Sequence, residues 1–148
     1  MLIEILKKIF QRDLEKLKQE IISYNNESNL WRIEKGIANS AGNLCLHLVG
    51  NLNTYIGAEI GKTGYVRDRD REFSQKNIPR DELVKMIEDT ITVVANGLNK
   101  LKEEDLEKEY PLLVFKEKTA TGYFLIHLTV HLGYHLGQVN YHRRLLDN

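Results

Sequence analysis

Four of the five histidines in this 148-residue chain lie at spacings that a helix would bring onto one face. At about 100° per residue, His127, His131, His135 and His142 fall within about 80° of one another, and Gln138 lies in the same arc. Imidazoles four residues apart are separated by about 6 Å of helical rise, so both can approach one ion about 2 Å from each nitrogen. The pattern therefore predicts a metal site on this helix.

The fifth histidine, His47, has polar neighbours of its own at helical spacing. Asn43, Asn51 and Thr54 share its face within about 80° on a second predicted helix. Because that helix carries no charge and is expected to be buried, its polar groups must line a cavity or hold an ion. His47 and two histidines of the other helix would form a three-histidine site with one or more open coordination positions.

A structural interpretation of each histidine stays open. A lone histidine on an apolar helix is usually a core residue with hydrogen-bonded nitrogens, and we assign this role to His142 and consider it for His127. The coincidence of overlapping His-x-x-x-His pairs with His47 on the only other uncharged helix favours a metal. Leu128 and Leu132 stand where a zincin metalloprotease has its general-base glutamate, so that class is not expected.

The charged residues avoid the two stretches that hold the histidines. Lys and Arg number 21, as do Asp and Glu, yet none lies in Gly36–Ala58 or Thr119–His142. The balanced total argues against a protein that binds nucleic acid and provides no basic patch for a membrane. Polar residues are spread through both stretches, so we expect buried helices of a soluble protein rather than membrane spans.

Compartment is predicted from the N-terminal segment and the cysteine content. Charges at Glu4, Lys7 and Lys8 interrupt any apolar region of a signal peptide. Cys45 is the only cysteine, so no intrachain disulfide can form. We therefore expect a cytoplasmic protein.

Apolar residues recur at helical spacing in four long segments. We expect helices from about residue 3 to Tyr24, from a cap at Asn39 or Ser40 to about Ile60, from Pro79 to about Leu101, and from a cap at Thr119 or Thr121 to about Leu146. This pattern predicts an all-α single domain over residues 1–148, a four-helix bundle with long connections. The second and fourth helices, nearly free of charge, are expected to pack most deeply.

Two of the connections carry further expectations. Tyr65–Ile78 is predicted to be a polar loop, and its charged run Arg67–Glu72 is interpreted as solvated rather than as a pocket wall with Trp31. Lys102–Lys118 is predicted to be an irregular charged connector in which Leu112–Phe115 pairs briefly as a strand.

Two segments resemble the signature helices of the DinB/YfiT-like superfamily. They are Asn39–Leu52, NSAGNLCLHLVGNL, and His131–Gln138, HLGYHLGQ. The likeness to uncharacterised bacterial members extends over nearly the whole chain, including the arginine-rich loop that ends in Glu72-Phe73. The resemblance implies a four-helix bundle, often dimeric, whose divalent ion is held by residues that fall here on His47, His131 and His135.

The resemblance also implies a class of chemistry. Some members of the superfamily transfer low-molecular-weight thiols such as bacillithiol or mycothiol to electrophiles, and others are isomerases or hydrolases. We therefore expect a divalent ion (Zn, Ni or Fe) that activates a small thiol or water for attack on a small electrophile, in a homodimer with no nucleic-acid or membrane partner. The alternative is a non-enzymatic metal-binding or stress-related structural bundle.

Several residues are candidates for support of the metal site. Asn51 lies one turn beyond His47 and Gln138 three residues past His135, so either could orient a ligand or bind a metal-bound water. Tyr55 and Tyr134 are candidate proton donors. Cys45 lies about 160° from His47 on the helical wheel and is expected to pack outward, away from the metal.

Overall fold

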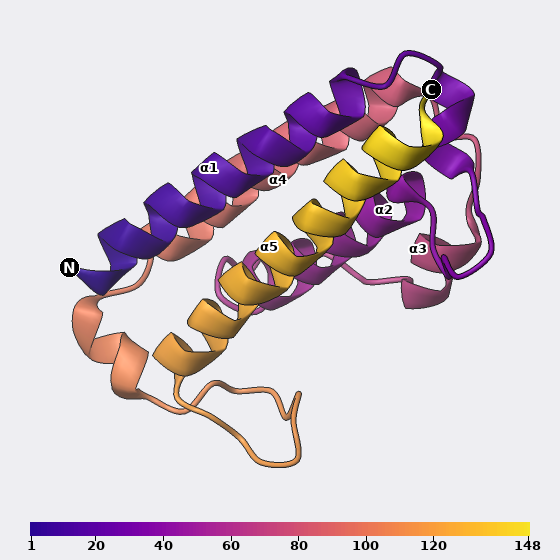
Figure 1. Ribbon diagram of the computed structural model, residues 1–148. Helices are drawn as coiled ribbons and strands as arrows, with labels where there is room; N and C mark the ends of the chain where they lie inside the picture. Colours follow the sequence, from indigo (N-terminus) through magenta and orange to yellow (C-terminus); the bar gives the residue numbers. More distant parts are fainter.

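The computed structural model describes residues 1–148, and its elements are all helical (Figure 1). Five α-helices follow one another along the chain: α1 (Leu2–Ile22), α2 (Ala41–Leu52), α3 (Arg69–Ser74), α4 (Arg80–Asn99) and α5 (Thr121–Leu146). Short 3₁₀ turns cover Glu27–Trp31 and Glu103–Glu107, and a π-helical segment, Asn53–Ala58, directly continues α2.

The four long helices lie side by side around one core. Helix α1 packs against α4 and α5, and α2 packs against both α4 and α5 (Figure 1). The apolar stripes of α1 and α4 point inward, because their apolar residues repeat at helical spacing while the charged residues face water. Fully buried members of the core include Leu17, Leu48, Leu83, Leu125 and Leu132.

Helix α2 begins where predicted but changes its winding before it ends. The Ser40 hydroxyl accepts a hydrogen bond from the backbone N–H of Asn43, so Ser40 is the cap. The predicted α-helix to Ile60 is regular only to Leu52, after which the chain widens into the π-helical segment. Gly97 of α4 allows this segment to approach closely, since a Cβ there would lie 2.8 Å from Cγ2 of Ile56.

Three other predicted boundaries are wrong. The predicted loop Tyr65–Ile78 contains the helix α3. Leu112–Phe115 pairs with no strand, and a single bridge joins Glu109 to Ala120 on either side of it. Neither predicted threonine caps α5: Ala120 occupies the cap position, and the Thr121 hydroxyl donates instead to the carbonyl of Lys108 at 2.9 Å.

The two helices that are nearly free of charge, α2 and α5, differ in depth, which corrects the expectation that both are buried. Nearly every residue of α2 is buried, whereas α5 has one buried face and one face open to water. Tyr123, Val130, Tyr134, Tyr141 and Leu145 are all more than 60% exposed. None of the helices combines the length and apolar character that crossing a membrane requires.

His142 is the hydrogen-bonded core residue that the sequence predicted. Its Nε2–H donates to the carbonyl of Arg32 at 2.9 Å, and its Nδ1 accepts from the Tyr24 hydroxyl at 2.6 Å. Both ring nitrogens are therefore satisfied in the neutral form. Burial lowers the pKa of His142, against the opposing effect of the Arg32 carbonyl.

This buried histidine should make the folded protein less stable in mild acid. The unfolded chain gains a proton near pH 6.5, whereas folded His142 gains it only at lower pH, so its contribution is complete above about pH 6.5 and is lost as pH falls below that value. We expect the free energy of unfolding, measured by urea titration between pH 7.5 and 5 with chelator present, to fall more steeply in the wild type than in His142→Gln. Equal slopes would contradict this account.

Candidate metal centre

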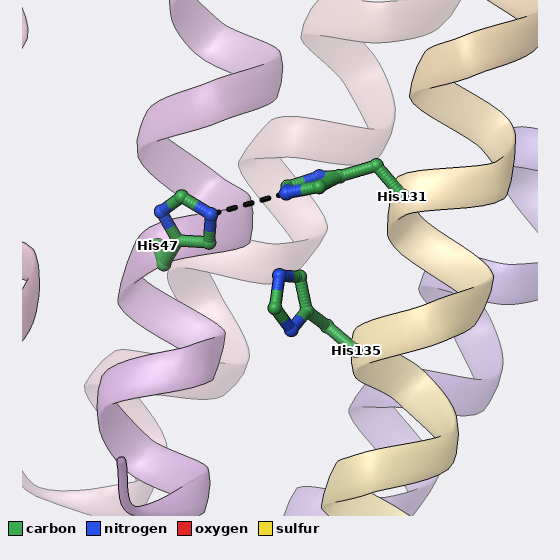
Figure 2. Close-up of side chains that lie close together, drawn as sticks. All are labelled: His47, His131 and His135. Atoms are coloured by element: carbon green, nitrogen blue, oxygen red, sulfur yellow. Dashed lines mark hydrogen bonds between the residues drawn. The ribbon is translucent and has the colours of Figure 1, made fainter. Parts of the chain in front are cut away.

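Three histidine side chains converge between α2 and α5. Helix α2 supplies His47, and α5 supplies His131 and His135 from successive turns, so the two helices face each other across the site (Figure 2). The Nε2 atoms of His47 and His131 lie 3.2 Å apart, and one ring nitrogen from each of the three histidines lies within 4.8 Å of the others. Figure 2 shows the three rings pointing into one common space.

Neighbouring side chains fix which nitrogen of each ring is free. Nδ1–H of His47 donates to Oε1 of Glu72 at 3.1 Å, and Nδ1–H of His135 donates to Oε1 of Gln138 at 2.7 Å. A neutral imidazole has one N–H, so these bonds leave the Nε2 lone pairs of both rings directed at the common space. A partner at the far nitrogen is the usual way in which a protein orients a metal-binding histidine.

Glu72 is buried beside His47 and is neutralised by an arginine. Arg67 donates from Nε to Oε2 at 2.8 Å and from one terminal nitrogen to Oε1 at 2.9 Å, a bidentate pair. Burial alone would raise the pKa of Glu72, but hydrogen bonds from His47 and Arg67 outweigh it and hold the pKa below its usual value. The carboxylate therefore stays ionised and keeps its proton acceptor on the His47 ring.

An asparagine on α2 places this carboxylate. The Asn43 amide donates to the carbonyls of Glu72 at 2.9 Å and Gln75 at 2.8 Å, and thereby binds the end of α3 to α2. Asn43 belongs to the polar stripe of α2 that was expected to line a cavity or hold an ion. Its amide instead satisfies backbone groups of the segment that carries Glu72.

Gly50 provides the space for the Glu72 side chain. It follows His47 by three residues on the same face of α2, and a Cβ at this position would overlap Oε2 of Glu72. Any larger residue here would force the buried carboxylate away from His47. The glycine is thus required by a close approach and not by a special backbone angle.

The environment favours the neutral form of the two triad histidines on α5. Burial, reinforced by His135 and His47, lowers the pKa of His131 to about 4, and burial also lowers the pKa of His135 despite its bond to Gln138. Neutral imidazoles are the form that binds metal ions. Cys45, by contrast, is fully buried in the core rather than packed outward, and burial raises the pKa of its thiol to about 12.

These residues fit a divalent metal ion. Metal–imidazole bonds of about 2.0–2.1 Å at a tetrahedral ion place ligand nitrogens about 3.4 Å apart. The Nε2 atoms of His47 and His131 already lie 3.2 Å apart, and side-chain rotation would bring the ligand nitrogens, which all lie within 4.8 Å of one another, to that spacing. Nδ1 of His131 is buried without a hydrogen-bond partner, so the only polar contact of this ring is the one between its Nε2 and Nε2 of His47 at 3.2 Å. A single proton shared by His47 and His131 would satisfy that pair but would not use the third nitrogen, on His135.

Two pockets of different character open beside the triad. A pocket of about 290 Å³ includes His47 and His131 in its wall and is rich in polar and cationic groups. A second, of about 500 Å³, includes His135 and is mainly apolar, with Ile37, Leu44 and Leu145 in its wall. The triad therefore lies where two pockets, one polar and one apolar, come close together.

The other residues that the sequence predicted for the site lie next to the triad or in the wall of the polar pocket. Gln138 contacts His135 as predicted, and Asn51 lines the polar pocket with a buried Oδ1 that has no partner.

The predicted tyrosines and His127 lie outside the triad. Tyr134 is exposed with its ring centroid 5.3 Å from that of His135, and Tyr55 lies beneath the Arg67 guanidinium at 5.8 Å. His127 is outside the triad, with its ring packed edge-on against Phe115 at 4.7 Å.

Glu72, Arg67 and Gly50 belong to the site but were not expected there from the sequence. The pattern of Arg67–Glu72 predicts a solvated charge run, whereas Glu72 is 5% exposed and bound to His47. The sequence did contain a signal for this part of the site. Arg67 and Glu72 are five residues apart, and Glu72 directly precedes Phe73, within the loop that resembles the superfamily. Trp31, considered as a pocket wall, packs instead on Gly42 at the start of α2.

Gly50→Ala should destabilise the protein, since the added methyl group displaces the buried Glu72 carboxylate from its partners. A buried group left without its hydrogen bonds costs about 1–3 kcal/mol. The matched control is Gly137→Ala on α5, where the methyl group meets nothing within 4 Å and where we expect a gain of up to about 1 kcal/mol. Urea denaturation in chelator measures both, and equal stability of the two variants would contradict the role of Gly50.

Comparison with known proteins places the chain in a family without assigning its chemistry. A search of curated proteins finds no match. The model of the family described as "Protein of unknown function (DUF1572)" matches residues 2–148, nearly the full length. The chain therefore belongs to the DUF1572 family.

Proposed function

We propose that this protein is a metal-dependent enzyme of the DinB-like type, a four-helix bundle that holds one divalent ion, Zn, Ni or Fe, on His47, His131 and His135. The observation that carries the proposal is the orientation of the rings. Two of the three have Nδ1–H anchored on an acceptor, so their Nε2 lone pairs converge with the third ring. Three neutral ligands would leave the ion its full charge and an open coordination position.

The chemistry that such an ion supplies is a lowered pKa of a bound thiol or water. Residues of this chain would orient the histidine ligands and the bound substrate. Glu72 and Gln138 hold the tautomers of His47 and His135, and Glu72 also increases the basicity of the His47 ring. Asn51 and Tyr134 are placed near the triad to orient or protonate what binds there.

Two pockets beside one triad favour group transfer between two substrates over hydrolysis of one. We propose that a low-molecular-weight thiol is transferred to a small electrophile. The new bond joins the thiol sulfur to the electrophilic carbon, the leaving group departs with its electron pair, and the thiol proton passes to solvent. The thiol must come from outside the chain, because Cys45 is buried and protonated. This proposal presumes a reducing, cytoplasmic compartment.

Protein purified without an affinity tag should contain about one divalent ion per chain, measured by elemental analysis. We expect His131→Ala and His135→Ala to lose the ion and the matched control His127→Ala, one turn away on α5 and outside the triad, to keep it. Glu72→Gln should weaken binding on the order of 10–100-fold, the usual effect of losing an outer partner of a metal-bound histidine. Unchanged metal content in either of the first two variants would refute the site.

The same proteins test the reaction. Consumption of a free thiol by a model electrophile should require the metal and disappear in His131→Ala and His135→Ala. Failure across a panel of thiols, electrophiles and hydrolysable esters, with metal bound, would instead support the non-enzymatic metal-binding bundle.

We also infer that two chains associate through the exposed face of α5. Its large apolar side chains lie within about 100° of arc along the helix, and Val130 lies near the middle at 64% exposure. Light scattering should give the mass of a dimer for the wild type and of a monomer for Val130→Glu. Val66→Glu, on a position 87% exposed outside α5, is the control that should stay dimeric. A monomeric wild type would contradict this inference.

A further inference from the structure

The polar pocket beside His47 and His131 has an excess of positive charge. No Asp or Glu lines it, while two arginines, Arg67 and Arg69, do. The charge of Arg67 is balanced by Glu72, which accepts hydrogen bonds from Nε and one terminal nitrogen of the guanidinium. The other terminal nitrogen of Arg67 is free. Arg69 forms no ion pair, so the pocket carries one uncompensated cation even before a metal ion is bound.

The Arg69 guanidinium is held near the triad by aromatic stacking. It lies over the ring of Phe73 at 5.9 Å, and that ring packs against His47 with centroids 5.0 Å apart. Stacking leaves the edge of the guanidinium, with its N–H groups, available to a ligand. Arg69 thus presents donors at one end of a pocket whose other end is the metal centre.

Other polar groups in this pocket also have no partner within the protein. Oδ1 of Asn51 is buried and unbonded, and the His127 ring makes no hydrogen bond. The rest of the wall comes from Tyr55 and from the apolar residues Val114, Phe124 and Leu128. A volume of about 290 Å³ lies at the small end of the range for ligand pockets, which is about 300–1,000 Å³.

We propose that this pocket binds the oxyanion group of a small molecule, a carboxylate or a phosphoryl group, with Arg69 as its counterion. Arginine matches both groups because its planar N–H donors pair with two oxygens at once. The free terminal nitrogen of Arg67 lies on the same wall and provides a further donor. The proposal rests on the proposed function in one respect: the anionic molecule is one of the two substrates of the triad.

Calorimetric titration of metal-free protein with succinate, inorganic phosphate and the neutral analogue succinamide tests the proposal. The protein is stripped with a chelator and dialysed, so that anions cannot bind a metal. We expect succinate or phosphate to bind and succinamide not to bind. The anion with the higher affinity shows whether the pocket prefers a carboxylate or a phosphoryl group. Arg69→Gln should weaken that binding at least about tenfold, because it removes the charge and the paired donors. Arg71→Gln, on the same helix but outside the pocket, should retain wild-type affinity.

Three outcomes would overturn the proposal: no binding of either anion, equal binding of succinamide, or wild-type anion affinity in Arg69→Gln. Titration of the same proteins with zinc separates this proposal from the metal centre. Anion binding that depends on Arg69 in a chain that takes up no zinc would refute the metal centre alone. Zinc uptake without anion binding would refute the anion pocket alone.

Discussion

The site depends on the hydrogen bonds of the buried Glu72 carboxylate with His47 and Arg67. This carboxylate is charged and almost inaccessible to water, and a buried charge is tolerated only when it is paired and hydrogen-bonded. Arg67 supplies the charge, His47 supplies an N–H, and Gly50 supplies the space. In return, the carboxylate determines which nitrogen of His47 faces α5. The tautomer of one histidine is thus set by a residue 25 positions away in sequence.

Helix α3 brings that carboxylate to α2, and α2 is built to receive it. The Asn43 amide donates hydrogen bonds to two backbone carbonyls at the end of α3. These bonds satisfy both the buried amide and the carbonyls, which would otherwise lie unpaired. The absence of charge on α2 follows from its burial, while two of its polar residues, Asn43 and His47, each have a partner outside the helix. The absence of charge from α5 before its last turn has a different meaning, since one face of that helix is open to water.

The two pockets give the triad an asymmetric environment. On the side of His47 and His131 the wall is polar and cationic, and on the side of His135 it is mostly apolar. An ion at the triad would therefore be approached by ligands of different chemistry from its two sides. This asymmetry is a property of the helix arrangement, because the two pockets draw on different turns of α5 and on different loops.

The sequence by itself determined the helical class and the helical spacing of the histidines, and the resemblance to the superfamily selected His47, His131 and His135 among them. Periodicity located the four long helices to within a few residues at most ends, and four-residue spacing fixed the relation of His131 to His135, because both properties are local. The roles of Glu72, Arg67 and Gly50 were decided only by the tertiary structure. A charged run such as Arg67–Glu72 has the same local pattern whether it is solvated or buried, and only the packing of α3 against α2 distinguishes the two. The same holds for α5: its composition shows that its only charged residues are Arg143 and Arg144 in the last turn, but the positions of its neighbours decide which face is covered.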